Sequence, residues 1–158
     1  MAWITPDSTY DPSATWSDDG NIKDNDTGTF AAWTFSGPGW TDYLQAFLDT
    51  PISCDKVRFW AEYNVARVNQ LILYVYYEDA WHNIFQGAFN NKDWTEKIIP
   101  EGTKTVSGIS IAFWHAGAGA WEAEYYECDF NEVPVPSQPK KWWFNLSARP
   151  DSEIVAAV

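Results

Sequence analysis

A short stretch near the N-terminus concentrates oxygen-bearing groups. Residues 22–30 read Ile-Lys-Asp-Asn-Asp-Thr-Gly-Thr-Phe. Calcium binds about six to eight oxygen ligands, many of them carboxylates and backbone carbonyls. Asp24 and Asp26 are two residues apart, so both can face one ion if the loop curls, and Thr29 can add a hydroxyl. With carbonyls from Ile22 and Asp26, this loop is a candidate calcium site.

Two other motifs could account for an oxygen-rich loop of this kind. An EF-hand needs glycine at its sixth position and glutamate at its twelfth, where this stretch has Thr29 and Phe35, so that motif is excluded. A turn rich in Asp and Asn that precedes a strand, with no metal, explains the same residues. The loop chemistry alone favours this turn.

The elements that would hold the loop are predicted to be β-strands. Residues 57–63 alternate with a period of two, and residues 71–77 are all apolar or aromatic and rich in β-branched and aromatic side chains, which predicts a buried strand. No stretch has a sustained helical period. Glycine, proline and asparagine turn signals separate the apolar runs. The predicted strands cover residues 30–35, 43–48, 57–63, 71–77, 83–89, 106–114 and 124–130.

Short strands at this spacing are typical of an all-β fold, a two-sheet antiparallel sandwich or jelly roll. A chain of 158 residues suits one such domain with a substantial core. The formal net charge of -12 would repel nucleic-acid backbones and anionic membranes, so neither is expected as a partner. With 11 tryptophans, some aromatic side chains are expected to face a partner.

The start of the chain has no basic region followed by an apolar run, so we do not read it as a signal peptide. Either this is a part of a secreted protein, or the protein reaches its place without the secretory route. Cys54 and Cys128 can form a disulfide if their strands are neighbours, or can be two small buried hydrophobic residues.

The composition changes at Val133. Residues 133–139, Val-Pro-Val-Pro-Ser-Gln-Pro, indicate an extended linker. Residues 140–146, Lys-Lys-Trp-Trp-Phe-Asn-Leu, and the apolar residues 154–158 follow. We therefore predict a sandwich over residues 1–132 and a linker with a docking tail over residues 133–158, which packs on its own sandwich or on a neighbouring subunit.

Several segments together resemble a known family. Residues 21–30, 43–60, 73–85 and 122–133 are similar, in order and spacing, to successive motifs of the discoidin, or coagulation-factor type C, family of galactose-binding-like jelly rolls. The resemblance covers about residues 1–132. It implies the same fold and a mostly non-catalytic role.

The resemblance also bears on the candidate calcium site. In this family the early loop often holds a structural calcium that is completed by a glutamate of the last strand. Glu127 matches that glutamate best, and Glu124 is the alternative. The implied ion would stabilise the fold and take no part in catalysis.

Candidate ligand-binding residues lie on loops, where carbohydrate-binding relatives of this fold hold sugars. They are Asn64, Arg67, His115 and Trp121, although tryptophan in a sandwich is usually core and a single Arg or His is usually a surface residue. Neither histidine belongs to a zinc motif, and no phosphate loop or nucleophile elbow occurs. We therefore expect no enzyme.

Two functions fit these features. The first is a structural protein that decorates a virion or another extracellular assembly, with protein subunits as partners through the tail, a possible homo-oligomer and possible glycan contacts. The alternative is a carbohydrate-binding module of a secreted enzyme or adhesin. The expected location is a virion surface or the extracellular space.

Overall fold

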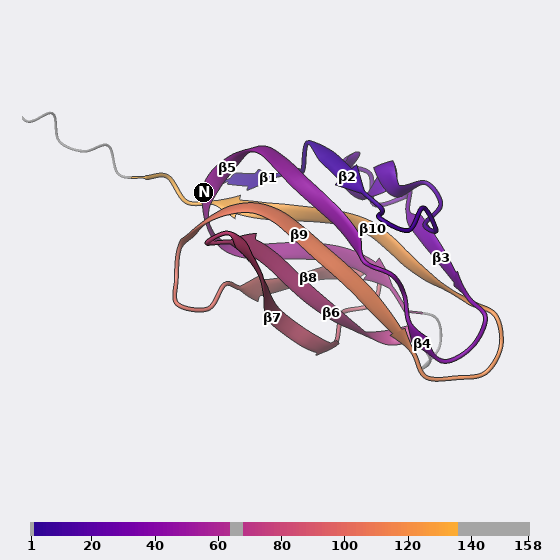
Figure 1. The fold of residues 1–158 in the computed structure, drawn as a ribbon. Coiled ribbons are helices and arrows are strands. Elements are labelled where there is room, and N and C mark those ends of the chain that lie inside the picture. Colours follow the sequence, from indigo (N-terminus) through magenta and orange to yellow (C-terminus); the bar gives the residue numbers. More distant parts are fainter. Residues whose placement is uncertain (1, 64–67, 136–158) are drawn as a thin grey trace, which may run out of the picture.

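The computed structural model describes residues 2–63 and 68–135, and residues 1, 64–67 and 136–158 lie outside this description. Within these ranges the chain is almost entirely β-structure (Figure 1). The elements are β1 (Ala2–Ile4), β2 (Ser8–Tyr10), the 3-10 helix η1 (Asp19–Lys23), β3 (Ala31–Phe35), β4 (Gly39–Trp40), β5 (Leu44–Glu62), β6 (Val68–Tyr77), β7 (Ala80–Ala88), β8 (Asp93–Ile98), β9 (Lys104–His115) and β10 (Trp121–Glu132).

The strands form two layers that share β5. In the first layer, which we call the front sheet, the order is β2, the first part of β5, β9, β6 and β7, and β4 adds to the end of β9. In the second, the back sheet, β1 and β3 pair with β10, which pairs with the second part of β5, followed by β8. All these pairs are antiparallel, which confirms the predicted two-sheet sandwich (Figure 1).

β5 joins two strands that the sequence predicted as separate. Residues 43–48 and 57–63 belong to one long strand, and the register against β9 shifts between Phe47 and Ile52. The break contains Pro51, which has no N–H to donate to a ladder and is tolerated at a bulge. The segment between the two predicted strands is therefore a bend at which one strand passes from the front sheet to the back sheet.

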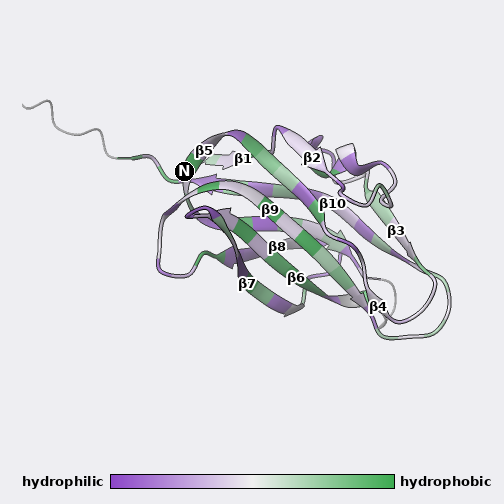
Figure 2. Ribbon diagram, in the orientation of Figure 1, coloured by the Kyte–Doolittle hydropathy of each residue, from purple (hydrophilic) through white to green (hydrophobic). Residues whose placement is uncertain are grey.

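The core lies between the two sheets. Alternate residues of β6 (Leu71, Leu73, Val75) and of β9 (Ile109, Ile111, Phe113) are buried there. Hydrophobic residues are concentrated along these strands in Figure 2. The prediction that residues 71–77 are buried throughout is wrong in part, because Tyr74 and Tyr76 are half-buried on the opposite side of the front sheet.

The remaining predictions about organisation have different outcomes. β10 ends at Glu132, and the N–H of Val133 donates to the carbonyl of Ser53 at 2.8 Å. Residues 136–158 lie outside the described ranges, so the docking tail stays a prediction.

Cys54 and Cys128 are buried and not bonded to each other. Within the described part of the chain, no helix has the length and apolarity needed to cross a membrane.

Candidate functional site

The oxygen-rich loop follows η1 and is held against β10 by backbone donors. The N–H of Asp26 lies 2.9 Å from Asp24 Oδ1 and 2.9 Å from Glu127 Oε1. Asn25 has a φ of 60°, the left-handed conformation that asparagine adopts more readily than most residues. The tight turn at Asn25 thus brings the loop backbone onto a carboxyl group of the last strand.

The carboxyl groups of the loop have separate roles. Asp24 Oδ2 accepts a hydrogen bond of 2.7 Å from the Thr29 hydroxyl, and Asp24 also hydrogen-bonds to Glu127. Asp26 Oδ1 instead accepts from the N–H of Gly28 at 2.8 Å. Of the predicted pair, therefore, only Asp24 contacts Glu127 through its carboxyl group, whereas Asp26 contacts it through its backbone N–H. The carbonyl of Ile22, another predicted ligand, accepts a hydrogen bond of 3.6 Å from the thiol of Cys128.

Glu127 is 1% exposed, and its surroundings change its ionisation. Burial, followed by the hydrogen bond and the charge of Asp24, raises the pKa of Glu127 to about 8. For Asp24 burial acts in the same direction, but hydrogen bonds from Thr29, Glu127 and the Asp26 backbone outweigh it and lower its pKa. Without a cation, the two carboxyl groups therefore share a proton at neutral pH.

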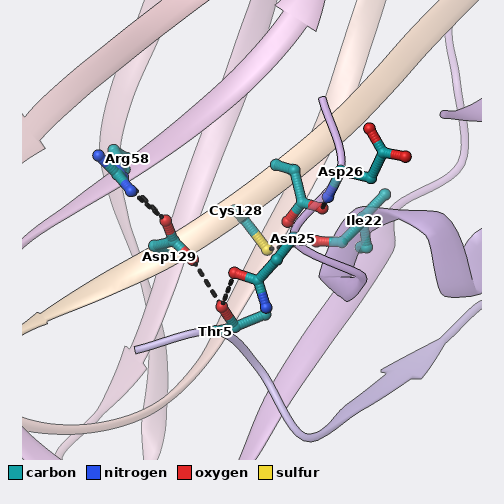
Figure 3. A network of polar contacts seen from close by, with 8 residues as sticks. Thr5, Ile22, Asn25, Asp26, Arg58, Cys128 and Asp129 are labelled. Atoms are coloured by element: carbon teal, nitrogen blue, oxygen red, sulfur yellow. Dashed lines mark hydrogen bonds and ion pairs between the residues drawn. The ribbon is translucent and has the colours of Figure 1, made fainter. Parts of the chain in front are cut away.

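A second polar network ties the same loop to the back sheet (Figure 3). The hydroxyl of Thr5 lies 2.7 Å from Asn25 Oδ1 and 3.1 Å from Asp129 Oδ1. Asp129 in turn forms an ion pair of 2.7 Å with Arg58. The guanidinium of Arg58 is stacked between Trp3 and Trp94, at 4.3 and 3.8 Å from the two ring centroids.

Of the predicted glycan-binding residues, His115 and Trp121 lie in the described part of the chain. Asn64 and Arg67 lie outside the described residues. His115 is fully buried, with Nδ1 3.1 Å from the carbonyl of Gly37, so its side chain offers no surface to a ligand, contrary to prediction. Trp121, at the start of β10, is partly buried. It lines a shallow depression together with Thr34, Ala120 and Glu122.

The exposed side of the front sheet carries a pocket that the sequence interpretation missed. The pocket has a volume of about 180 Å³. Strand register explains how it forms: Gln45 of β5 and Tyr74 of β6 both pair with Ser110 of β9, so the three side chains lie in one row on one face. The lining residues are Tyr43, Gln45, Tyr74, Trp81 and Ser110.

Aromatic residues from both flanks close over the central strand. Tyr43 meets Tyr74 edge-on with ring centroids 5.7 Å apart, and Phe47 meets Trp81 in the same way at 5.9 Å. A side chain at Gly108 would lie 3.0 Å from Phe47 and 3.2 Å from Trp81. The small residue in β9 is therefore what allows these rings to approach each other. The walls of the pocket are thus aromatic rings, and its polar lining groups are the amide of Gln45 and the hydroxyl of Ser110.

The same face is free of formal charge. Residues 44–48, 70–77, 80–88 and 105–115 contain no Asp, Glu, Lys or Arg, although 20% of the whole chain is charged. This absence, together with Tyr74 and Tyr76 alternating with buried residues, is the sequence signal that could have identified the face.

In the described residues we find no group of three or more His, Cys, Asp and Glu side chains placed to hold a metal.

Comparison with known proteins gives matches at the level of structure. No protein-family model and no curated protein matches the sequence. The carbohydrate-binding module CBM32-1 of a family 31 glycoside hydrolase from Clostridium perfringens is 12% identical, with a TM-score of 0.61 over 81% of this chain and 96% of that module. The family 32 module of Clostridium perfringens NanJ, solved with galactose, is 11% identical, with a TM-score of 0.57 over 78% and 90% of the two chains.

An F5/8 type C domain from Bacteroides fragilis is 17% identical, with a TM-score of 0.51 over 84% of this chain and 98% of that domain. At these identities the similarity establishes the fold. The chain has the discoidin-like, galactose-binding-like β-sandwich fold, as its resemblance implied.

Proposed function

We propose that this chain is a non-catalytic carbohydrate-binding domain that holds a sugar in the pocket of the front sheet. The observation that carries the proposal is that pocket, with aromatic walls and polar groups in one row. A volume of about 180 Å³ is below the roughly 300–1,000 Å³ of pockets for drug-sized ligands, so it suits one ring-sized group. The similar solved modules support the same function.

The lining chemistry fits a sugar ring. Trp81, Tyr43 and Tyr74 present aromatic surface on which the C–H face of a pyranose can rest. The half-buried amide of Gln45 can donate to and accept from sugar hydroxyls, whereas the hydroxyl of Ser110 is only 3% exposed and offers a ligand little surface. No carboxyl group is among the described residues that line the pocket, so the pair of acids that glycoside hydrolysis requires is missing there.

Of the two functions that the sequence allows, we favour the carbohydrate-binding module over virion decoration, because the comparisons offer no support for the latter. An extracellular location is part of the proposal, since a glycan-binding domain acts where glycans are displayed. Assembly with protein subunits through residues 133–158, and homo-oligomer formation, remain separate predictions.

We further propose a structural calcium at the oxygen-rich loop. Asp24 and Glu127 supply carboxylates, and neutral oxygens of Ile22, Asp26 and Thr29 would complete the set, which suits a hard cation. A buried carboxyl group next to a second one is the arrangement that a bound cation would stabilise. Thermal unfolding with calcium and with chelator tests this, because equal midpoints in both conditions would refute it.

Binding to a sugar panel tests the carbohydrate proposal. We would titrate galactose, glucose, mannose and N-acetylglucosamine, and neutral oligosaccharides of each, into the protein by calorimetry. Replacing Trp81 with alanine should weaken binding at least about tenfold, the loss of roughly 1.4 kcal/mol. The matched control is Trp60→Ala, on the back sheet, which should bind as the parent does. Binding that is unaffected by Trp81→Ala, or absent for every sugar, would overturn the proposal.

A further inference from the structure

The front sheet carries more aromatic surface than one sugar ring requires. Trp40 of β4 pairs with Trp114 of β9, and their ring centroids are 5.3 Å apart. Trp40 is 40% exposed, so a large apolar side chain is open to solvent beyond the end of the pocket. Exposed aromatic surface of this kind marks a contact site more often than an isolated apolar residue does.

The aromatic pairs follow one line along β9. Gly108, Ser110, Ala112 and Trp114 point to the same face, because side chains in a strand alternate with a period of two. Phe47 and Trp81 meet beside Gly108, and Tyr43 and Tyr74 meet beside Ser110. The third ring pair is formed by Trp114 itself with Trp40. Gly108 and Trp114 are six residues apart, roughly 20 Å at about 3.3 Å per residue. One sugar ring cannot span that length, but an extended chain of rings can.

Uncharged amides line the flank of this path on the β6 and β7 side. Gln70 pairs with Trp114, Asn83 pairs with Tyr74, and Gln86 pairs with Ile72, so all three lie on the front face. Each of these amides is exposed. An amide carries both donors and an acceptor and therefore matches a sugar hydroxyl, which also does both.

Charge decides which glycans fit. Residues 44–48, 70–77, 80–88 and 105–115 carry no formal charge. Lys104, at the start of β9, forms ion pairs with Glu78 and Glu101. The nearest exposed acids are Asp42 and Asp49, before and after the first part of β5, and Asp79 in the β6–β7 turn. Because Lys104 is already paired with two glutamates and the net charge is -12, this face is unfavourable for a carboxylate or a sulfate. Uronic acids and sulfated sugars would meet repulsion on this face.

From these observations we infer that the front sheet binds an extended, neutral glycan along β9, with Trp40 and Trp114 as a second stacking platform beyond the pocket. This inference rests on the proposed function and names the ligand class of the same site. The proposed site does not include the loops at the end of the sandwich, where Trp121 lies at the start of β10.

A length series tests the inference. Neutral oligosaccharides of one to six rings, and the matching uronic acid oligomers, would be titrated by calorimetry into the parent, Trp114→Ala and Trp81→Ala proteins. We expect affinity to rise with length over the first few rings, and Trp114→Ala to cost about tenfold for the longest chain but little for the single ring. Trp40→Ala, at the more exposed partner, provides a second variant should Trp114→Ala fail to fold.

The outcomes separate the two proposals. Affinity that does not depend on length would overturn the extended site while leaving the single-ring pocket in place. Tighter binding of the uronic acid series would overturn the neutral class. If no sugar binds and light scattering shows a dimer that Trp81→Ala dissociates, the face is an interface between two copies, and both proposals are wrong.

Discussion

At the scale of single residues, Glu127 is a buried carboxyl group whose ionisation is changed by its surroundings. Its carboxyl group is buried against Asp24, and its pKa is raised to about 8. A proton or a cation is needed to offset the repulsion between the two groups. The contact between the loop and the last strand therefore depends on pH, and the proposed calcium would take the place of the proton.

The pH dependence has a definite sign. In chelator, the folded protein binds the Glu127 proton more tightly than the unfolded chain does, because the pKa is about 8 in the fold against 4.5 ordinarily. This contribution is complete below pH 4.5 and is lost as the pH rises towards 8, on the order of a few kcal/mol in all. Urea unfolding between pH 5 and 8 should show the fall.

Glu127→Gln should remove most of that slope, because the amide cannot lose a proton. Glu132→Gln, on the same strand, is the control and should keep the parental slope. A Glu127→Gln protein whose stability falls with pH as steeply as the parent would contradict this assignment.

Arg58 is the second residue on which we make a prediction. Its partner Asp129 has a side chain only 5% exposed, so Arg58→Ala leaves a buried charge unpaired and should cost about 3 kcal/mol in the free energy of unfolding. Lys56→Ala, which breaks an exposed ion pair with Glu96, should cost less than about 1 kcal/mol. Urea titrations followed by tryptophan fluorescence measure both, and equal losses would refute the distinction.

At the scale of elements, β9 determines the shape of the front face through its small residues. Gly108→Val should force Phe47 and Trp81 apart, cost about 1–3 kcal/mol in stability and weaken sugar binding. Gly37→Ala is the control, since nothing lies within 4 Å of a Cβ there. Unfolding and sugar titrations on the same samples test it. Parental stability and binding in Gly108→Val would contradict this packing.

The sequence predicted the long strands and missed others for physical reasons. Residues 104–115 and 121–132 form strands close to the predicted ranges, because each buries a long run of side chains. β8 was missed: of Asp93–Ile98 only Thr95 is buried, so this edge strand has little apolar pattern. The union of residues 43–48 with 57–63 was missed because Pro51 resembles a turn in sequence.

At the scale of the whole molecule, the candidate site could be predicted only in part. The loop and Glu127 are 101 residues apart, and the family resemblance brought them together correctly. The front-sheet pocket needs the register of β5, β9 and β6, which no single segment encodes. Its lining side chains are therefore unremarkable in sequence and meet only after the sheets form.

The tail gives a prediction at the same scale. If residues 136–158 mediate assembly, light scattering should give a defined oligomer for the full chain and a monomer for a chain ending at Val135. Both should have the same circular dichroism in the β region, as a control for folding. Equal masses for the two chains would remove self-assembly as the role of the tail.

The most direct test of the central claim is to follow the indole N–H signals of isotope-labelled protein by NMR during titration with the neutral sugar panel. Single Trp→Phe variants would assign the signals. We expect Trp81 and Trp114 on the front sheet to shift, while Trp60 and Trp94 on the back sheet stay in place. Shifts confined to Trp121, at the loop end of the sandwich, or no shifts at all, would contradict a glycan site on the front sheet.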